Sequence, residues 1–446
     1  MEKLRQLICW LIYGFVFLLP FQTRWIYQQG QLNGADWEYG TFSLYATEAL
    51  FLVVLILGVF FVIQYVRNLR QRRIRLWRKE SPPEADSPMA KRNQLLKRLV
   101  LFFSILAIFV INVFIAINRE IAFYKLEQII AASALFFVIW LVKPDFNKIA
   151  WSFALSGLVQ CALVIQQFVE QKVIANKWLG MAEQLPATLG VPIVQIGDER
   201  WLRAFGSFPH PNFLAGFLVI ALILTLGLFL LTENRKHCRL LLAISVVQFL
   251  ALLTALSRAG IIVFVVGAVF LLVSAWREKA LRPKIIRVIA ILLFIGLAFS
   301  VSYPELVVSR VRTDSRVENL SNAARVEQYR EWSSVVETNW FTGVGLGNYT
   351  VALSKLKPNL PAWAYQPVHN VYLLLFAELG LFGLTLCLLF LVHLVHLARL
   401  ACPARLACFT CLVCLACLAV FDHYLWSFWS GLMLASIVLA LALIES

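Results

Sequence analysis

The sequence is poor in charged residues, because Asp, Glu, Lys and Arg make up only 15% of its 446 residues, against roughly 25% in soluble globular proteins. Hydrophobic residues make up 61%, and the mean hydropathy is +0.77. A water-soluble fold of this composition would need a core larger than single domains build. The same figures exclude a collagen, a disordered protein and a small disulfide-bonded scaffold. The composition therefore predicts an integral membrane protein.

Apolar runs of roughly 15 to 25 residues, which can cross a bilayer as helices, recur along the whole chain. There are about twelve of them. They cover residues 4–21, 43–66, 100–117, 126–142, 149–169, 213–231, 240–256, 261–275, 288–301, 371–397, 406–420 and 425–444. The predicted fold class is an all-α integral membrane protein, with residues 1–446 forming a single polytopic membrane domain. No internal repeat of fixed period divides it.

Basic residues outnumber acidic ones, 40 to 25, and they are unevenly distributed among the loops. With the N-terminus inside and the spans alternating, most Lys and Arg fall in inner segments, as the positive-inside rule requires. This arrangement puts both termini in the cytoplasm and explains the positive charge without a nucleic acid partner. The first span lacks an A-x-A-like cleavage site, so we interpret it as an uncleaved helix.

The inner segment 67–99 is the most basic part of the chain, and its stretch Ser81–Pro88 is too polar to fold. We interpret this segment as a cytoplasmic topology anchor with a flexible tether. Recognition of lipid headgroups is the alternative.

Two outer segments, 170–212 and 303–370, are too long to be simple connectors, and loops of that size are usually functional. In the second, Val326, Tyr329 and Trp332 recur at helical spacing, which predicts an amphipathic helix over residues 323–336 on the membrane face. A glycine-rich turn, Thr342–Asn348, follows. It does not match the dinucleotide-binding fingerprint, since no βαβ unit surrounds it.

None of the nine cysteines falls in the predicted outer segments, which suits a face exposed to an oxidising space without disulfides. Four of them recur every third residue from Cys408 to Cys417. That spacing lacks the last step of a ferredoxin cluster run and spreads the thiols around a helix, so it favours packing over metal binding.

Ionisable residues at the outer ends of the spans are the candidates for chemistry, because charges in the membrane are costly. They are Arg203, Arg258, Arg325 and His369, all on the same predicted side. Guanidinium groups bind phosphate oxygens in pairs and stay charged. A histidine can accept a proton from a hydroxyl at ambient pH. Together they predict a transferase that acts on a phosphate-activated, membrane-embedded donor.

Each of these residues also has a simpler explanation. Arg203 and Arg325 could be solvated loop cations, Arg258 an interfacial anchor, and His369 a surface or capping residue. The pair Asp422 and His423 in an outer turn could orient one another.

Acidic residues at two positions could also take part in a site. Asp36-x-Glu38 in the first outer loop is the one acidic pair placed where membrane glycosyltransferases bind a metal, but a lone pair in a polar loop is usually solvated, so we predict no metal. Glu378 lies nine residues beyond His369, about 13 Å along a helix. We expect it to bond a neighbouring helix rather than the imidazole.

Short motifs in the C-terminal part of the chain resemble the O-antigen ligase and polymerase superfamily of bacterial envelope glycan enzymes. His369-Asn370, nine residues and Gly380-Leu-Phe-Gly383 are similar to the ligase signature H-[NSQ]-x9-G-x-x-[GTY]. The preceding motifs agree in order: Arg203-Ala-Phe-Gly206, Pro209-His-Pro-Asn212, Ser257-Arg258, and Arg325 before Gly343–Asn348. The resemblance covers roughly the C-terminal 250 residues, with residues 257–397 as the O-antigen-ligase-like region.

The resemblance implies a fold similar to the GT-C class of glycosyltransferases, with a periplasmic site under the loop 303–370, in the bacterial cytoplasmic (inner) membrane. It implies an undecaprenyl-diphosphate-linked glycan as donor, a glycan, lipid A core or protein as acceptor, and no metal or other cofactor. His369 would then be the base, and Arg258 and Arg325 would hold the diphosphate. Arg203 and Asn212 would line the donor groove, with Asn370 and Asn348 in support.

The expected reaction is direct attack of the acceptor hydroxyl on the anomeric carbon, with inversion. Ligation to lipid A core, polymerisation of repeat units and transfer to a protein hydroxyl share this chemistry, and the sequence does not separate them. A transporter or flippase of anionic solutes or lipid-linked glycans is the rival class. Such proteins often show two related halves and polar breaks near mid-bilayer, which are not found here.

Overall fold

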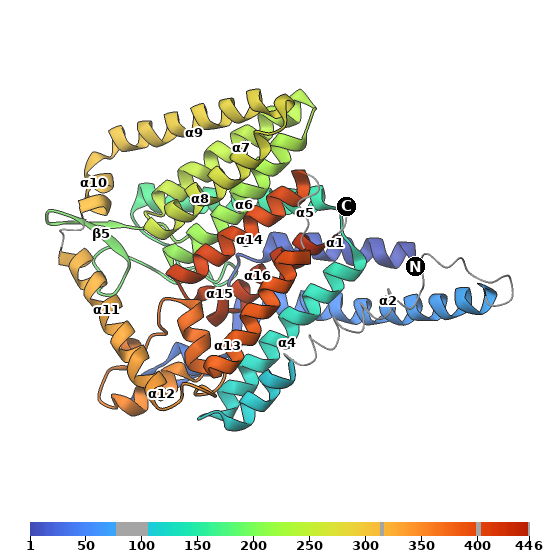
Figure 1. Cartoon of the computed structure of the whole chain (residues 1–446). Helices are drawn as coiled ribbons and strands as arrows, with labels where there is room; N and C mark the ends of the chain where they lie inside the picture. The colour runs from blue at the N-terminus through green and yellow to red at the C-terminus, as the bar shows by residue number, and fades with distance from the viewer. Residues whose placement is uncertain (77–105, 313–315, 398–402, 445–446) are drawn as a thin grey trace.

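The computed structural model describes residues 1–76, 106–312, 316–397 and 403–444 (Figure 1). Most of the predicted linker 67–99 and the start of the predicted span 100–117 lie outside the described residues. Residues 67–76 of that linker continue helix α2.

The described part of the chain is mostly helical, with 73% of its residues in helices. The long helices are α1 (Glu2–Leu18), α2 (Ala46–Leu76), α4 (Arg119–Val142), α5 (Phe146–Glu170), α6 (Pro211–Leu231), α7 (Arg235–Thr254), α8 (Arg258–Ala275), α9 (Arg282–Ser302), α13 (Val371–Leu397), α14 (Pro403–Phe421) and α16 (Trp429–Leu443). A four-residue helix, α15 (Tyr424–Ser427), separates the last two.

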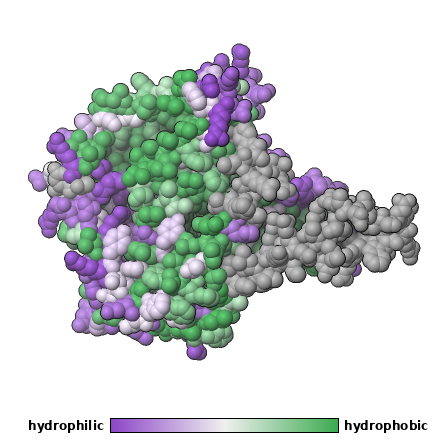
Figure 2. All heavy atoms as spheres, viewed as in Figure 1, coloured by the Kyte–Doolittle hydropathy of each residue, from purple (hydrophilic) through white to green (hydrophobic). Residues whose placement is uncertain are grey.

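Eight of the described helices are long and apolar enough to cross a membrane, and three shorter apolar helices, Leu106–Ile115, Leu406–Phe421 and Trp429–Leu443, accompany them. Helix α1, 17 residues long, covers most of the first predicted span. On the face shown in Figure 2, apolar residues cover the middle of the bundle, and hydrophilic residues gather over the end where α10 and α11 lie. The helical membrane fold is therefore confirmed, whereas the number of crossings stays a prediction.

Helix α6 lies at the centre of the bundle, packed against α5, α7, α8 and α14. All of its residues from Phe213 to Leu230 are buried. A helix that is apolar all round lies in a protein core or in a membrane, and here its neighbours cover it on all sides. The cysteines of α14 join this packing, since Cys408, Cys411 and Cys414 are buried apolar contacts.

Three short antiparallel hairpins depart from the all-α expectation. They pair β1 (Arg24–Gln28) with β4 (Phe42–Tyr45), β2 (Gln31–Leu32) with β3 (Ala35–Asp36), and β5 (Ile193–Ile196) with β6 (Glu199–Leu202). In the first hairpin Arg24 faces Tyr45, and in the third Ile193 faces Leu202. Hairpins of this length give little periodic signal next to long apolar helices, so the sequence analysis missed them.

The predicted outer segment 303–370 folds into α10 (Pro304–Arg312), α11 (Arg316–Glu337) and α12 (Tyr349–Leu356). We call the end of the bundle that carries these helices and β5 the loop end; both chain termini lie toward the opposite end (Figure 1). Helix α11 covers the predicted range 323–336. Its C-terminal part is anchored to α13, because the indole Nε1 of Trp332 donates a hydrogen bond of 2.7 Å to the Leu373 carbonyl.

Helix α13, predicted as one unbroken span, is interrupted at Gly380, whose φ is +69°. The break lets the Gly343–Gly347 turn pack backbone to backbone against the helix: the amide of Val344 donates to Ala377 O over 2.9 Å, and that of Leu381 donates to Trp340 O over 2.8 Å. A Cβ at position 380 would lie 2.0 Å from a main-chain oxygen. Only glycine fits this position.

Candidate functional site

His369 lies at the loop end, immediately before α13. The Asn370 side chain begins that helix, because its Oδ1 accepts a hydrogen bond of 3.1 Å from the Leu373 amide. The His369 Nδ1 is 2.8 Å from Oε1 of Gln328 on α11. A helix start on one side and α11 on the other therefore fix the imidazole, which stays partly exposed.

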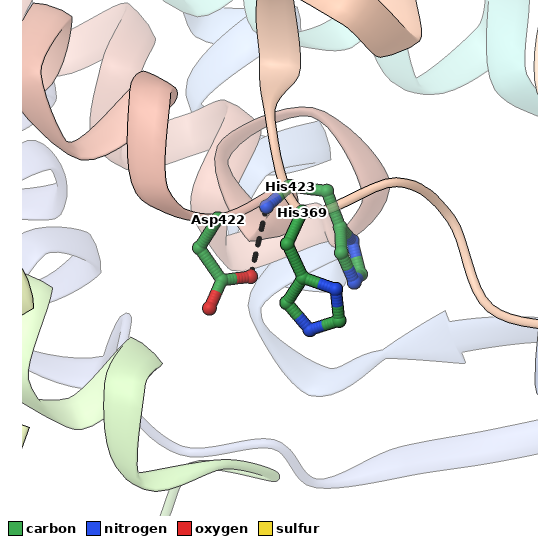
Figure 3. Close-up of side chains that lie close together, drawn as sticks. All are labelled: His369, Asp422 and His423. Carbon is green, nitrogen blue, oxygen red and sulfur yellow. Dashed lines mark hydrogen bonds between the residues drawn. The ribbon is translucent and has the colours of Figure 1, made fainter. Parts of the chain in front are cut away.

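Asp422 and His423, in the turn between α14 and α15, lie beside His369 (Figure 3). One potential ligand atom from each of the three side chains lies within 4.8 Å of the others. The two imidazole rings are nearly perpendicular, with centroids 5.2 Å apart. Asp422 accepts a 2.8 Å hydrogen bond from the His423 amide. We call these three residues the histidine cluster.

Asn212, at the start of α6, connects the histidine cluster to Arg203. Its Nδ2 donates to the Asp422 carboxylate over 3.0 Å. Its Oδ1 accepts hydrogen bonds from Arg203 Nη2, at 2.7 Å, and from Ser257 Oγ, at 3.0 Å. The buried Arg203 also donates to the Ala255 carbonyl over 3.2 Å. The structure thus brings Arg203 and Asn212 together with Asp422, and the arginine is already engaged by protein groups.

Burial governs the protonation of the cluster. Burial would raise the pKa of Asp422, but the neighbouring imidazoles of His369, His423 and His210 and the Asn212 amide hold it at about 2. Burial lowers the pKa of His423 to about 4. It also lowers the pKa of His369, which Asp422 raises and Arg325 lowers further. At neutral pH the cluster therefore holds an ionised carboxylate and neutral imidazoles.

His210, which the sequence analysis did not single out, belongs to the same surroundings. Its Nδ1 accepts a 3.1 Å hydrogen bond from the Asn212 amide as the N-cap of α6. Burial and Arg203 lower its pKa to about 3. Its position inside the Pro209–Asn212 motif was the available signal.

A second group of charges links α8, α10 and α11. Arg258 Nη2 lies 2.9 Å from Oε2 of the buried Glu318, and Arg310 pairs with the same carboxylate. Arg325, half-buried on α11, lowers the pKa of both His369 and Arg310. Arg325 is therefore near enough to act electrostatically on both the histidine cluster and Arg310. In this group three guanidinium groups accompany the one carboxylate of Glu318, which leaves an excess of formal positive charge.

Two residues of this charged group were missed by the sequence analysis. Arg310 is one of several basic residues in a polar stretch, and Glu318 lies on the polar N-terminal part of α11. Nothing in their spacing distinguishes them from solvated loop charges.

Asn348 and Glu378 serve the framework around the site. Asn348 Oδ1 accepts a 2.6 Å hydrogen bond from the Asn118 amide, and its Nδ2 donates to the Asn118 and Leu346 carbonyls. Its side chain therefore holds the glycine-rich turn against the start of α4, not the histidine cluster. Glu378 accepts a 2.8 Å hydrogen bond from Nε1 of Trp426 on α15, so the expected bond to a neighbouring helix is confirmed.

Two places offer acidic groups that a metal could use. Glu38 forms a two-pronged ion pair with Arg24, at 2.6 and 2.9 Å, and Asp36 is exposed on β3, so one carboxylate of the pair Asp36-x-Glu38 is already engaged by a cation. Among the residues that the structure describes, the histidine cluster alone gathers three potential ligands. Both Asp422 oxygens already accept hydrogen bonds there, and the absence of a metal stays a prediction.

An apolar groove of about 320 Å³ runs along the bundle between α4, α13, α14 and α16. Its lining is almost entirely aliphatic and aromatic. Val371, Leu425 and Trp426 at one end of the groove are close in sequence to His369 and His423. One end of the groove therefore lies near the histidine cluster.

Residues 240–388 match the family model described as O-antigen ligase. The matched region contains Arg258, Arg325 and His369, whereas Arg203 and Asp422 lie outside it. Among curated proteins, none matches the chain. The match confirms the resemblance to the O-antigen ligase superfamily over this region of the chain.

Proposed function

We propose that this member of the O-antigen ligase superfamily transfers a glycan from an undecaprenyl diphosphate carrier to an acceptor hydroxyl, at a loop end that faces the periplasm. One observation carries the proposal: a neutral His369 beside the ionised Asp422 lies next to an arginine group with excess positive charge. That is the pairing that a base and a diphosphate leaving group require.

His369 acts as the base. Because Gln328 Oε1 accepts from Nδ1, the Nε2 atom carries the free lone pair. The acceptor hydroxyl gives its proton to Nε2 while its oxygen bonds to the anomeric carbon, and the bond from that carbon to the diphosphate oxygen breaks. Attack from the face opposite the leaving group inverts the anomeric configuration. The expected products are the lengthened acceptor and the lipid diphosphate.

Asp422 stabilises the imidazolium that forms in this step. The carboxylate is ionised and buried, and one of its oxygens lies within 4.8 Å of a His369 ring nitrogen. It is held in place by the Asn212 amide and the His423 backbone. Charges fixed in advance stabilise a transition state without reorganisation during the reaction.

The arginines bind the leaving group. Arg258 and Arg310 share Glu318, so neither positive charge is fully compensated, and Arg325 adds a third guanidinium toward His369. Such forks match phosphate oxygens in pairs. The bonds of Arg203 to Ala255 and Asn212 favour a supporting role: it holds Asn212, and through it Asp422.

The apolar groove supports a lipid-linked donor. A polyprenyl tail that lies between α4, α13, α14 and α16 would leave its head group at Val371 and Leu425, close to His369. Because the tail already lies in the hydrocarbon of the bilayer, the groove would hold it by packing contacts, while the arginines bind the charged end.

The test is transfer of a labelled glycan from undecaprenyl diphosphate by the purified full chain, offered lipid A core, a second carrier-linked repeat unit or a protein acceptor in turn. His369→Ala and Arg258→Ala should abolish transfer while membrane insertion stays normal. His237→Ala and Arg239→Ala replace the same residue types at exposed positions near the start of α7 and should keep full activity. Full activity of His369→Ala at normal expression would reject the proposed role.

A further inference from the structure

A second, polar and aromatic pocket lies beside the histidine cluster, with a volume of about 80 Å³. It is enclosed by the first hairpin, α4, α12, α13 and α15. Its lining includes seven large aromatic side chains: Tyr39, Tyr45, Tyr124, Tyr349, Trp426, Phe428 and Trp429. Since a water needs roughly 10–15 Å³ by the same measure, the space suits several waters or one monosaccharide ring.

Two hydroxyls that line this pocket lack partners. Tyr349 and Thr350, at the start of α12, are 1% and 2% exposed, and neither Tyr349 Oη nor Thr350 Oγ1 has a hydrogen-bond partner among the described residues. A buried hydroxyl without a partner is costly and rare in native proteins. A neighbouring hydroxyl in the same pocket, that of Tyr124, is satisfied by the Ser43 carbonyl at 2.8 Å. Tyr349 and Thr350 therefore have capacity to bond a ligand.

The charges around the pocket balance. Arg24 and Glu38 form a two-pronged ion pair. On the other wall, the basic side chain of Lys125 is matched by the acidic side chain of Glu378, which also accepts hydrogen bonds from the Trp426 indole N–H and the backbone amides of Gly347 and Tyr349. None of the arginines proposed to bind diphosphate lines this pocket. An anion would gain little here.

An uncharged sugar meets all of these conditions. The C–H faces of its ring are apolar and pack on aromatic rings, while its edge carries hydroxyls that both donate and accept hydrogen bonds. Pockets of this kind, with aromatic walls and a few placed polar groups, are typical of small-molecule sites.

The pocket also reaches the reacting residues. Ser427 lines it and lies 2.9 Å from Nδ1 of His423. Pro367, another lining residue, precedes His369 by two positions. The ring of Tyr39 is 6.1 Å from that of His423, and its hydroxyl donates to Gln366 Oε1 over 2.8 Å.

We propose that this pocket, formed by the aromatic residues above with Tyr349 and Thr350 as hydrogen-bonding groups, binds the uncharged sugar of the acceptor. The assignment to the acceptor rests on the proposed function: in an inverting attack the nucleophile and the diphosphate lie on opposite sides of the anomeric carbon. A pocket that adjoins the histidine cluster but contains none of the diphosphate-binding arginines suits the acceptor.

Binding is tested on the purified full chain in detergent, without any donor, by saturation-transfer difference NMR. The probes are the methyl glycosides of glucose, galactose and N-acetylglucosamine, with methyl glucuronide as a charged comparison. At least one neutral glycoside should bind, and the glucuronide should bind more weakly. Tyr349→Phe and Thr350→Val each remove one hydroxyl and should weaken binding about three- to tenfold.

Matched controls are Tyr65→Phe on α2 and Thr385→Val on α13, neither of which lines the pocket. They should bind as the unaltered chain does, and Thr350→Ser, which keeps the hydroxyl, should retain binding. Because the hydroxyls of Tyr349 and Thr350 bond nothing, removing them should leave the melting temperature unchanged or higher.

The proposal is overturned if no neutral glycoside binds, if the glucuronide binds best, or if Tyr349→Phe and Thr350→Val bind as tightly as the controls. His369→Ala should bind the glycoside normally. The loss of transfer in His369→Ala tests the proposed function, whereas its glycoside binding tests the pocket. Either proposal can therefore fail without the other.

Discussion

Replacing Asp422 with asparagine gives the sharpest test of the histidine cluster. The substitution keeps the size of the side chain and removes its charge. One carboxylate oxygen lies within 4.8 Å of a His369 ring nitrogen. At an effective dielectric constant of about 20, two unit charges at that distance interact by about 3 kcal/mol. The imidazolium formed during transfer would lose this stabilisation, so we expect kcat to fall roughly 100-fold.

The pH profile of the same variant provides a second measurement. Asp422 raises the pKa of His369, so its removal lowers that pKa. A base must be unprotonated to act, and the acidic limb of kcat/KM follows its pKa in the free enzyme. Asp422→Asn should therefore move the acidic limb to lower pH while the plateau falls. Transfer of a radiolabelled glycan between pH 4 and pH 8 measures both.

Asp198→Asn, in the exposed turn between β5 and β6, is the control and should change neither quantity. An Asp422 that only supported the fold would lower the plateau through lost protein and leave the limb in place. A normal plateau, or a limb that moved to higher pH, would refute the reasoning.

Two further predictions concern the arginines and the glycines. Arg325→Gln should weaken the inhibition of transfer by inorganic diphosphate roughly tenfold. The control is Arg330→Gln on the same helix, whose side chain is 76% exposed, and it should leave the inhibition constant unchanged. Equal inhibition constants for the two variants would show that Arg325 does not bind the leaving group. Gly380→Ala should strongly reduce the yield of folded protein in detergent, because the added Cβ would clash with a main-chain oxygen and the residue has a positive φ. Gly296→Ala on α9 should be tolerated, because the nearest atom to its added Cβ is 3.9 Å away. Gel filtration of both variants measures the folded yield.

Hydropathy predicted most of the fold, because a bilayer selects helices of nearly fixed length. Apolar helices lie in the described parts of all the predicted spans. Hairpins β1–β4 and β5–β6 were not predicted, because short strands in a loop bury few side chains and show no clear alternation of apolar and polar residues. The break at Gly380 was not predicted either. It depends on packing against a turn about 35 residues earlier in the chain, and hydropathy gives no information about such long-range contacts.

The candidate site could be predicted only in part. His369, Arg258 and Arg325 stand out because motif spacing or position in the membrane singles them out. Arg310 and Gln328 do not, since each becomes important only when α10 and α11 fold over the bundle. The sequence indicates that Asp422 and His423 could act as a pair. It does not predict their contact with His369, because that contact brings together segments more than 50 residues apart, and residue spacing predicts neighbours only within one helix.

The first part of α13 explains the spacing of the motif His369-Asn370-x9-Gly380. Asn370 caps the helix, and Gly380 ends its first regular part, so the nine residues between them form a rigid rod of about 13 Å. Its far end is fixed by backbone bonds to the Gly343–Gly347 turn. Each added or removed residue would rotate the His369 end by about 100° and shift it by about 1.5 Å. The rod thus sets the height and direction of the imidazole toward Asp422, which explains why glycines and histidine occur at a fixed interval.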